Sequence, residues 1–368
     1  MMSYFIRRIL LVPITFICIT LMVYTVIRVT PGGPIERAQA EARNAQNAEG
    51  GGGGMLMDSG EGGLLSPKAL KGLKEYYKLD KNILHGYLIW LGAWPDNHLN
   101  PDGSREWGFK GVLQLDLGRS YTFSDPVLAT IVSKFRISIY FGLIGYIASW
   151  LVCIPLGVLK AIHHRTLFDT LSSVTVFLGY SVPGFVAALV LMLLFATDNY
   201  GMNFFPLGGF VSDNYDAMWA QGEIWWCIKD KIHHTFIPLV AYMMASFATM
   251  TILMKNSLLD NLGSDYVRTA FAKGLSEKRV IFIHALRNSL IPICVGVGHA
   301  IGLILAGSFL IEKTCDIPGM GLLGYESLIR RDYPVIMGIL TIAVVIRLTG
   351  NIISDLVLAL VDPRVRFS

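Results

Sequence analysis

The last apolar run of the chain, residues 334–361, contains two charged side chains, Arg347 and Asp355, and the amide side chain of Asn351. Charged side chains inside a membrane are costly, and they usually face a helix-bundle interior or a water-filled path. Arg347 could therefore meet an anionic group in such a path, pair with Asp355, or extend its guanidinium to the membrane surface. Asp355 lies two helical turns away, which is long for direct contact. We take the three residues as candidates for a translocation pathway, and the interpretations of Arg347 stay open.

Motifs of covalent catalysis do not occur in this sequence, which has no GxxxxGKS or GxxxxGKT, no HExxH and no GxSxG. The segment 319–324, GMGLLG, matches GxGxxG, but no predicted strand precedes it, so we predict a turn there. The five cysteines show no CxxC spacing, which argues against zinc or redox chemistry. Cys227 and Cys315 could both face an oxidising compartment, and whether they pair stays open. We expect no catalytic residue, metal or cofactor in this chain.

The composition is that of a membrane protein. Hydrophobic residues make up 53% of the 368 residues and charged residues 16%, whereas a soluble domain carries about 25% charged residues. Five uncharged runs are long enough to cross a bilayer as helices, namely 9–27, 137–159, 170–197, 235–254 and 288–311. With the interrupted run 334–361, they predict an all-α polytopic protein with six transmembrane helices. There is no basic stripe interleaved with aromatic residues, so we expect no nucleic-acid partner.

Small residues follow one face of the fifth predicted helix, at Gly298, Gly302 and Ala306. Such spacing lets two membrane helices approach closely. We predict helix packing at these positions rather than a pore lining.

Lysine and arginine in the short loops indicate the orientation. With a cytosolic N-terminus, the outside loops 198–231 and 312–332 hold five basic residues, and the inside segments hold twelve: Arg7, Arg8, Lys160, Arg165, Lys255, Arg268, Lys273, Lys278, Arg279, Arg287, Arg364 and Arg366. Both termini are therefore predicted to be cytosolic, with 1–29 forming a tail and the first helix and 362–368 a second tail. The first apolar run is longer than the apolar stretch of a usual signal sequence, so we favour a retained helix.

The outer segment 30–133 divides into two parts. Residues 31–63 are rich in Gly, Ala and Gln, a composition that predicts a flexible excursion. Order should resume at Ser66-Pro67, a helix-start signal. Short amphipathic helices are then predicted from the spacing of Leu70, Leu73, Tyr87, Trp90 and Leu91. They could cap the helix bundle or form a docking platform for a partner, and both interpretations stay open.

A polar stretch at 264–292 lies between two apolar runs and is predicted to protrude into the cytosol. Leu258, Leu262, Tyr266 and Ala270 are spaced four apart, which predicts one helix with a single apolar face. This cytosolic loop, 256–288, belongs to the predicted transmembrane core, 134–361.

Gly274 is predicted to form an elbow within this stretch. Lys273 would end the first helix, Gly274 would take a left-handed C-cap, and Ser276 would be the N-cap of a second helix. Basic residues surround the elbow, namely Arg268, Lys273, Lys278 and Arg279. A rigid helix with a charged rim suits insertion into a groove on another protein.

The same stretch resembles the coupling motif of ABC importer permeases, and in particular their oligopeptide and dipeptide branch. The resemblance lies in Tyr266, Arg268, Thr269, Ala270, Ala272, Lys273, Gly274, Leu275 and Ser276, followed by His284, Ala285, Leu286, Arg287, Asn288 and Pro292. Arg268-Thr269-Ala270 replaces the general Glu-Ala-Ala pattern, as is typical of the peptide branch.

The resemblance extends over nearly the whole chain. It includes YFIRRILLVPITF at the N-terminus, TPGGP at 30–34, DLGRS at 116–120, IEKTCDIPGMGLLGYES, RDYPVIMG and VDPRVRF. TPGGP, the Gly-rich excursion and KNSLLD are most similar to the Yej-type peptide permease B subunits. Lys313 and Cys315 stand where more apolar residues are usual.

The resemblance implies a type I ABC importer permease fold in a bacterial inner membrane. It implies a second homologous permease subunit, two cytosolic ATPase subunits or domains that bind ATP and Mg, and a periplasmic peptide-binding protein. The transported substrate would be a peptide, and residues 264–288 would couple the membrane helices to the ATPases. Arg347 would then be a candidate for contact with a peptide carboxylate.

Two other classes of protein would show different sequence patterns. A secondary transporter or channel without an ATPase would show several intramembrane acids or histidines as an ion relay, but only His299, Arg347 and Asp355 lie within the predicted helices. A membrane-embedded enzyme would need a catalytic constellation at one membrane depth, and the sequence contains none.

Overall fold

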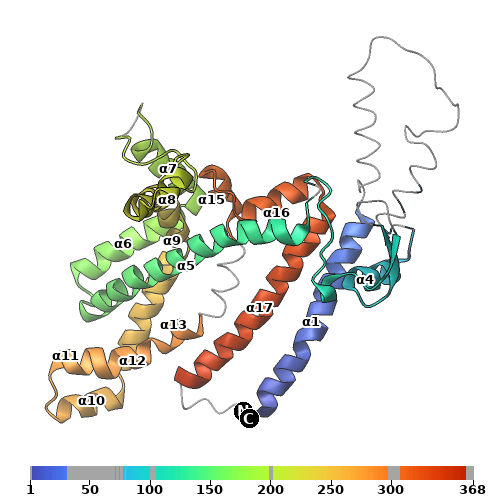
Figure 1. Cartoon of the computed structure of the whole chain (residues 1–368). Coiled ribbons are helices and arrows are strands. Elements are labelled where there is room, and N and C mark those ends of the chain that lie inside the picture. Colours follow the sequence, from blue (N-terminus) through green and yellow to red (C-terminus); the bar gives the residue numbers. More distant parts are fainter. Residues whose placement is uncertain are drawn as a thin grey trace. The chain divides into compact units, whose positions relative to one another are not determined.

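The computed structural model describes residues 2–30, 71, 74, 78, 80–99, 105–123, 125–198, 202–296 and 307–361 (Figure 1). The chain forms two compact units. Unit 1 comprises Met1–Ile14, Ile131–Glu326 and Ile342–Ser368, and unit 2 comprises Thr15–Thr130 and Ser327–Thr341. The glycine-rich segment 31–63 lies outside the described residues.

Three helices are long and apolar enough to cross a membrane. The apolar spans are Ile6–Val29 within α1 (Met2–Val29), Val127–Ile162, which is α5, and Tyr333–Leu360 within α17 (Tyr333–Val361). Two bent helix pairs raise the number of spans to as many as five in the part of the chain that the structure describes. The middle of the fifth predicted helix, 288–311, lies outside this part, because residues 297–306 are not described.

The apolar run 170–197 was predicted to form a single helix, and the structure contradicts this. It divides into α6 (Leu167–Ser181) and α7 (Gly184–Phe195), which meet at 99°. Val182 is extended, with φ −93° and ψ 119°, because the ring of Pro183 disfavours helical geometry at the residue before it. The second bent pair lies within α9 (Ile224–Leu262), where Ile224–Met244 and Ser246–Leu262 meet at 54°.

A hydrophobic cluster in unit 1 joins α5, α7 and α9 to α15 (Phe309–Thr314). Its buried members are Phe141, Ala188, Met192, Ala196, Ile237, Ala241, Ile311, Cys315 and Ile317. Cys315 and Cys227 are both buried, and all five cysteines are free thiols. Cys227 and Cys315 therefore do not form a disulfide in this structure. Sγ of Cys315 contacts Sδ of Met192 at 3.8 Å.

A buried carboxylate explains the glycine-rich segment 319–324, which enters α16 (Met320–Ile329) instead of forming the predicted turn. Glu312 is 1% exposed. Its carboxylate accepts hydrogen bonds from the Tyr242 hydroxyl at 3.1 Å and from the backbone N–H of Leu322 at 2.7 Å. A Cβ on Gly319 would lie 2.5 Å from Cδ of Glu312. Glycine is therefore required for close packing around this carboxylate.

Unit 2 contains a short helix and a small hairpin in its described residues. Helix α4 (Ile83–Leu91) confirms the helix predicted around Tyr87, Trp90 and Leu91, whereas Leu70 and Leu73 lie outside the described residues. The hydroxyls of Tyr87 and Thr20 on α1 are 2.8 Å apart, which fixes α4 against α1. Strands β1 (Asp96–Leu99) and β2 (Arg105–Gly108) pair antiparallel, a feature that the sequence patterns did not indicate.

Short helices complete the described chain: η1 (Val112–Gln114), α8 (Tyr215–Ala220), α10 (Asp265–Ala272), α11 (Glu277–Arg279), the π-helix η2 (Val280–Ala285), α12 (Leu286–Ser289) and α13 (Ile291–Val295). Helix α5 begins at Val127, which lies inside the predicted outer segment 30–133. The protein is therefore mostly helical, as predicted, with one small hairpin.

Candidate functional site: the coupling elbow

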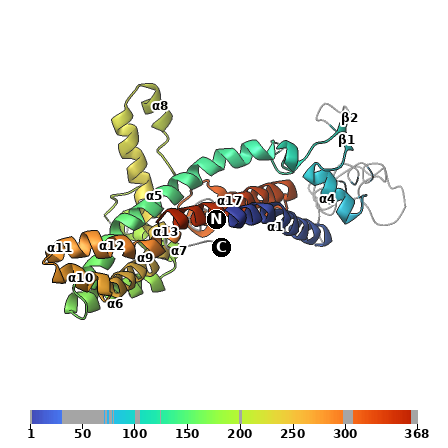
Figure 2. The same cartoon turned by 90° about the horizontal axis from the view of Figure 1, so that it is seen from below.

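The polar stretch after α9 forms two short helical arms joined by a bend. Figures 1 and 2 show α10 lying beside α11 and α12 in both views. The predicted single helix through Leu258 and Ala270 is wrong, because α9 ends at Leu262 and α10 begins at Asp265. Ser264 interrupts the helix with an extended backbone, φ −77° and ψ 151°. The elbow is therefore carried on a separate short helix.

The interruption changes which face of α10 is buried. Val267 is 1% and Ala270 8% exposed, whereas Tyr266 is 36% exposed. Tyr266 was predicted on the apolar face, but its hydroxyl donates to Oδ1 of Asn261 at 2.7 Å. The buried face of α10 passes through Val267 and Ala270, so the four-residue spacing predicted Ala270 correctly and Tyr266 wrongly.

Gly274 adopts the predicted left-handed conformation, with φ +78°. Its N–H donates to the carbonyl of Phe271 at 2.9 Å, which closes the C-terminus of α10. A Cβ at this position would have no atom within 4 Å. Glycine is therefore favoured here by backbone conformation and not by lack of space.

The second arm begins at α11. Ser276 occupies the predicted N-cap position, with φ −64° and ψ 145°, although its side chain makes no capping hydrogen bond. The helix continues through η2, in which π-type hydrogen bonds widen the turn, and through α12. Glu277 lies in the first turn, where a carboxylate interacts favourably with the helix dipole.

The outer surface of the elbow combines cations with apolar side chains. Arg268, Lys273, Lys278 and Arg279 are exposed, as predicted for a charged rim, and so are Thr269, Ala272 and Ser276, while Leu275 is half-buried. The only ion pair described within this rim joins Arg268 and Asp265 at 3.8 Å, and both side chains are at least 75% exposed, so it contributes little stability.

Three exposed apolar side chains on the two arms were missed by the sequence analysis. Phe271 is 46%, Phe282 53% and Ile283 56% exposed. Phe271 could have been found, since it adjoins the predicted buried Ala270 and so faces away from the core. Apolar side chains next to exposed cations are the composition of a protein-binding surface rather than of a solvated loop.

The inner faces of the arms pack into a hydrophobic cluster that we call the coupling core. Its buried members come from α5, α9, α10, η2 and α13, namely Val158, Ala161, Met254, Leu258, Val267, Ala270, Val280, Ala285 and Ile293. The same cluster therefore contains residues of the elbow and residues of two membrane helices. Because packed cores deform little, a displacement of α10 is passed to α5 and α9.

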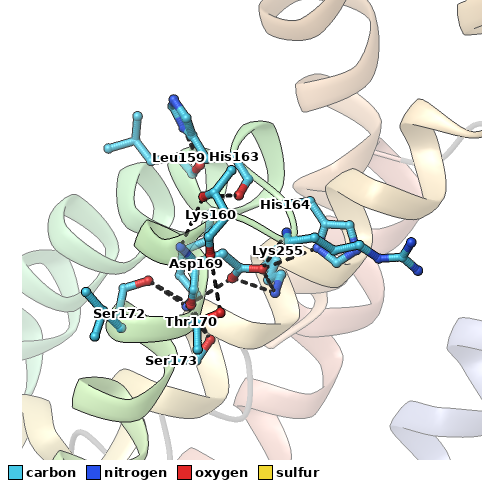
Figure 3. Close-up of polar contacts among 12 residues, drawn as sticks. Leu159, Lys160, His163, His164, Asp169, Thr170, Ser172, Ser173 and Lys255 are labelled. Atoms are coloured by element: carbon cyan, nitrogen blue, oxygen red, sulfur yellow. Dashed lines mark hydrogen bonds and ion pairs between the residues drawn. The ribbon is translucent and has the colours of Figure 1, made fainter.

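Charged residues lie next to the coupling core (Figure 3). Lys160 on α5, Asp169 on α6 and Lys255 on α9 form ion pairs, with Nζ–Oδ1 distances to Asp169 of 3.4 Å from Lys160 and 2.7 Å from Lys255. This cluster was not predicted from the sequence. Its signal was a single charged residue near the end of each of three successive apolar runs.

The pathway candidates on α17 are placed differently from one another. Asp355 pairs with Arg8 of α1 and not with Arg347. Arg347 is exposed, has no ion-pair partner among the described residues, and lies near the middle of α17, while Asn351 is half-buried. The paired interpretation of Arg347 and Asp355 is therefore wrong. The packing candidates Gly298, Gly302 and Ala306 lie outside the described residues.

No group of three or more metal-ligating side chains occurs within the described ranges.

Comparison with known proteins identifies the family. Residues 153–367 match the model of the binding-protein-dependent transport system inner membrane component. The chain belongs to this family. The match begins within α5 and includes the elbow, the coupling core and α17.

Relatives match over their full length. The inner membrane ABC transporter permease protein YejB of Escherichia coli O157:H7 is 36% identical, over 99% of each chain. The peptidoglycan transport system permease protein YejB of Agrobacterium fabrum is 34% identical, over 99% of this chain and 98% of the relative. The dipeptide transport system permease protein DppB of Escherichia coli K12 is 31% identical, over 100% of this chain and 99% of the relative.

Proposed function

We propose that this chain is the permease subunit of an ABC importer that moves peptides or peptide-like compounds across the bacterial inner membrane. Support comes from the family, from full-length similarity to peptide and dipeptide permeases, and from the apolar helices. The similarity to a peptidoglycan transport permease makes short cell-wall peptides a substrate to test beside ordinary oligopeptides. The chain itself carries out transport and no bond chemistry.

The observation that carries the proposal is the two-sided elbow. Its inner face, Val267 and Ala270, belongs to the same core as α5 and α9, while Arg268, Phe271 and Phe282 are exposed on its outer face. A cytosolic ATPase that binds this outer face in two different ways could drive two arrangements of the membrane helices. Differential binding of this kind is the thermodynamic requirement for coupling.

The other components follow from this role. ATP and Mg²⁺ bind in two ATPase subunits or domains, a second homologous permease completes the pathway, and a periplasmic protein delivers the peptide. Both termini are placed in the cytosol by the positive-inside rule. Arg347 and Asn351 are proposed to face the pathway, because an exposed guanidinium midway along a membrane helix requires water or an anion.

The test uses the elbow glycine in the complete importer, reconstituted in vesicles. Gly274→Val places a β-branched residue at φ +78°, a conformation that such residues avoid. Gly274→Asn is the matched control, because asparagine adopts left-handed geometry readily. We expect Gly274→Val to reduce ATP-dependent peptide uptake at least 10-fold, with normal membrane insertion, and Gly274→Asn to stay within about 2-fold of the wild type, as a strained residue at such a site costs 1–3 kcal/mol.

The competing function, a transporter or channel that acts without an ATPase, predicts a different outcome. Uptake by the purified chain alone, unchanged by ATP, would favour it. Failure of ATPase chains to co-purify with the wild-type protein would also contradict the importer proposal.

A further inference from the structure

A single carboxylate joins three membrane helices next to the coupling core (Figure 3). Asp169 lies in the first turn of α6. Nζ of Lys255 on α9 donates to both of its carboxylate oxygens, to Oδ1 at 2.7 Å and to Oδ2 at 2.8 Å. Lys160 of α5 lies 3.4 Å from Oδ1. Asp169 is thus the common partner of α5 and α9.

The side chains of Lys160 and Asp169 are buried, and each donor of the Lys160 ammonium has an acceptor. The side chain of Lys160 is 1% exposed and that of Asp169 is 8% exposed. Nζ of Lys160 donates to the Asp169 carbonyl at 3.1 Å, to Oγ of Ser172 at 2.8 Å and to Oγ of Ser173 at 2.7 Å. An ammonium has three donors, and all three are used. Separating these groups would leave a buried charge without a partner, which is strongly unfavourable.

Two groups beside the carboxylate add to this arrangement. The backbone N–H of Arg165 donates to Oδ2 of Asp169 at 3.2 Å, and Nδ1 of His164 lies 3.3 Å from the same oxygen. Together with the N-cap Thr166, these contacts fix the loop between α5 and α6. The start of α6 is therefore held from both sides.

The cluster adjoins the coupling core in sequence and in space. Lys160 precedes Ala161 and Lys255 follows Met254, and both Ala161 and Met254 are members of the core that contains Val267 and Ala270 of α10. No described residue of α6 belongs to that core. Apolar packing in the core therefore connects the elbow to α5 and α9, whereas the ion pairs of Asp169 extend the connection to α6.

We propose that Asp169, held between Lys160 and Lys255, is a positioning residue that makes α5, α6 and α9 move as one block when the elbow is displaced. This inference rests on the proposed coupling function. Helix α6 continues into α7 across a bend of 99°. A rigid start of α6 would therefore pass the displacement to α7 and to the hydrophobic cluster that contains Ala188 and Met192.

The experiment measures peptide imported per ATP hydrolysed by the complete importer in vesicles. Lys255→Met removes the bidentate contact, and Lys255→Arg retains it, since a guanidinium pairs with a carboxylate through two parallel hydrogen bonds. We expect Lys255→Met and Asp169→Asn to lower the ratio at least 5-fold while basal ATP hydrolysis and co-purification of the ATPases persist. Lys255→Arg should keep the wild-type ratio within about 2-fold, because it restores the same charge-assisted contact.

The outcomes separate a positioning role from a structural one. If Lys255→Met lowers uptake and ATP hydrolysis in the same proportion, or if Lys255→Arg fails as badly as Lys255→Met, the inference is overturned. A wild-type ratio in both Asp169→Asn and Lys255→Met overturns it as well. Failure of the proposed function has a separate signature, since uptake by the wild-type complex would then not require ATP at all.

Discussion

The carboxylate of Asp332 and the hydroxyl of Ser120 form a buried hydrogen bond of 2.5 Å across 212 positions of sequence. The same carboxylate accepts from the backbone N–H groups of Tyr121 and Thr122, at 3.1 Å each. The carbonyl of Asp332 accepts from Ile336 in the first turn of α17. Within unit 2, the DLGRS and RDYP sequences therefore form one structure, in which a carboxylate at the start of α17 binds the loop before α5.

Asp332→Asn tests this connection. An amide has a single acceptor oxygen and brings donors toward the N–H groups, so we expect a loss of about 2–3 kcal/mol in the free energy of unfolding. Thermal unfolding in detergent measures it. Ser327→Ala is the control, since Oγ of Ser327 is buried without a hydrogen-bond partner among the described residues, and its removal should cost almost nothing. Equal thermal unfolding temperatures for Asp332→Asn and Ser327→Ala would show that the contacts of the Asp332 carboxylate do not stabilise the protein.

Gly319 should tolerate alanine poorly, because of its distance to Glu312. The added Cβ would lie 2.5 Å from Cδ of Glu312, and overpacking of this kind costs about 1–3 kcal/mol. Gly108→Ala is the control, since a Cβ there meets nothing within 4 Å. In the Glu312→Ala background, Gly319→Ala should cost less than it does alone. Additive unfolding free energies in this double-mutant cycle would show that Gly319 does not pack on Glu312.

Asp96 should make the outer hairpin sensitive to acid. Burial opposes the charge of Asp96, but Lys78 and Lys81 together with a backbone hydrogen bond outweigh it, and the net effect lowers the pKa of Asp96 below its ordinary 3.8. A lowered carboxyl pKa contributes stability that is present above the ordinary value and is lost as the pH falls through the folded value.

Hydrogen exchange of the β1–β2 amides between pH 2.5 and 7 measures this contribution. We expect wild-type protection to exceed that of Asp96→Asn by about 1.5–3 kcal/mol at pH 6, a typical value for hydrogen bonds to a charged group. The difference should shrink as the pH falls below 3.8. A difference that stays constant down to pH 2.5 would exclude the ion pairs as its source.

Arg347 gives a prediction about substrate selection. If its guanidinium meets the C-terminal carboxylate of a peptide, Arg347→Met should reduce uptake of a free-acid peptide about 10-fold or more relative to the same peptide amide, since a hydrogen bond to a charged group contributes about 1.5–3 kcal/mol. Arg347→Lys keeps the charge and should retain most of the preference. The measured quantity is the uptake of the free-acid peptide divided by the uptake of the peptide amide. Wild type and variant are compared with the same binding protein, so the preference of that protein affects both ratios equally. An unchanged ratio in Arg347→Met would remove Arg347 from the pathway.

The sequence alone determined the helical membrane class, the family and the place of the elbow at Gly274. Long uncharged runs can satisfy their backbone hydrogen bonds in lipid only as helices, and the left-handed Gly274 is a local property of the chain. Local patterns also located the N-cap at Ser276 and the outer helix around Tyr87.

Only the tertiary structure decided which charges meet and which faces are buried. Asp355 pairs with Arg8, Asp169 gathers lysines from two other helices, and Glu312 explains glycines that resembled a nucleotide motif. Each of these contacts joins separate helices or loops, and helical periodicity carries no information about neighbours across a bundle. The break at Ser264 had a similar effect on a smaller scale, since α10 begins anew after it and buries Val267 in place of Tyr266.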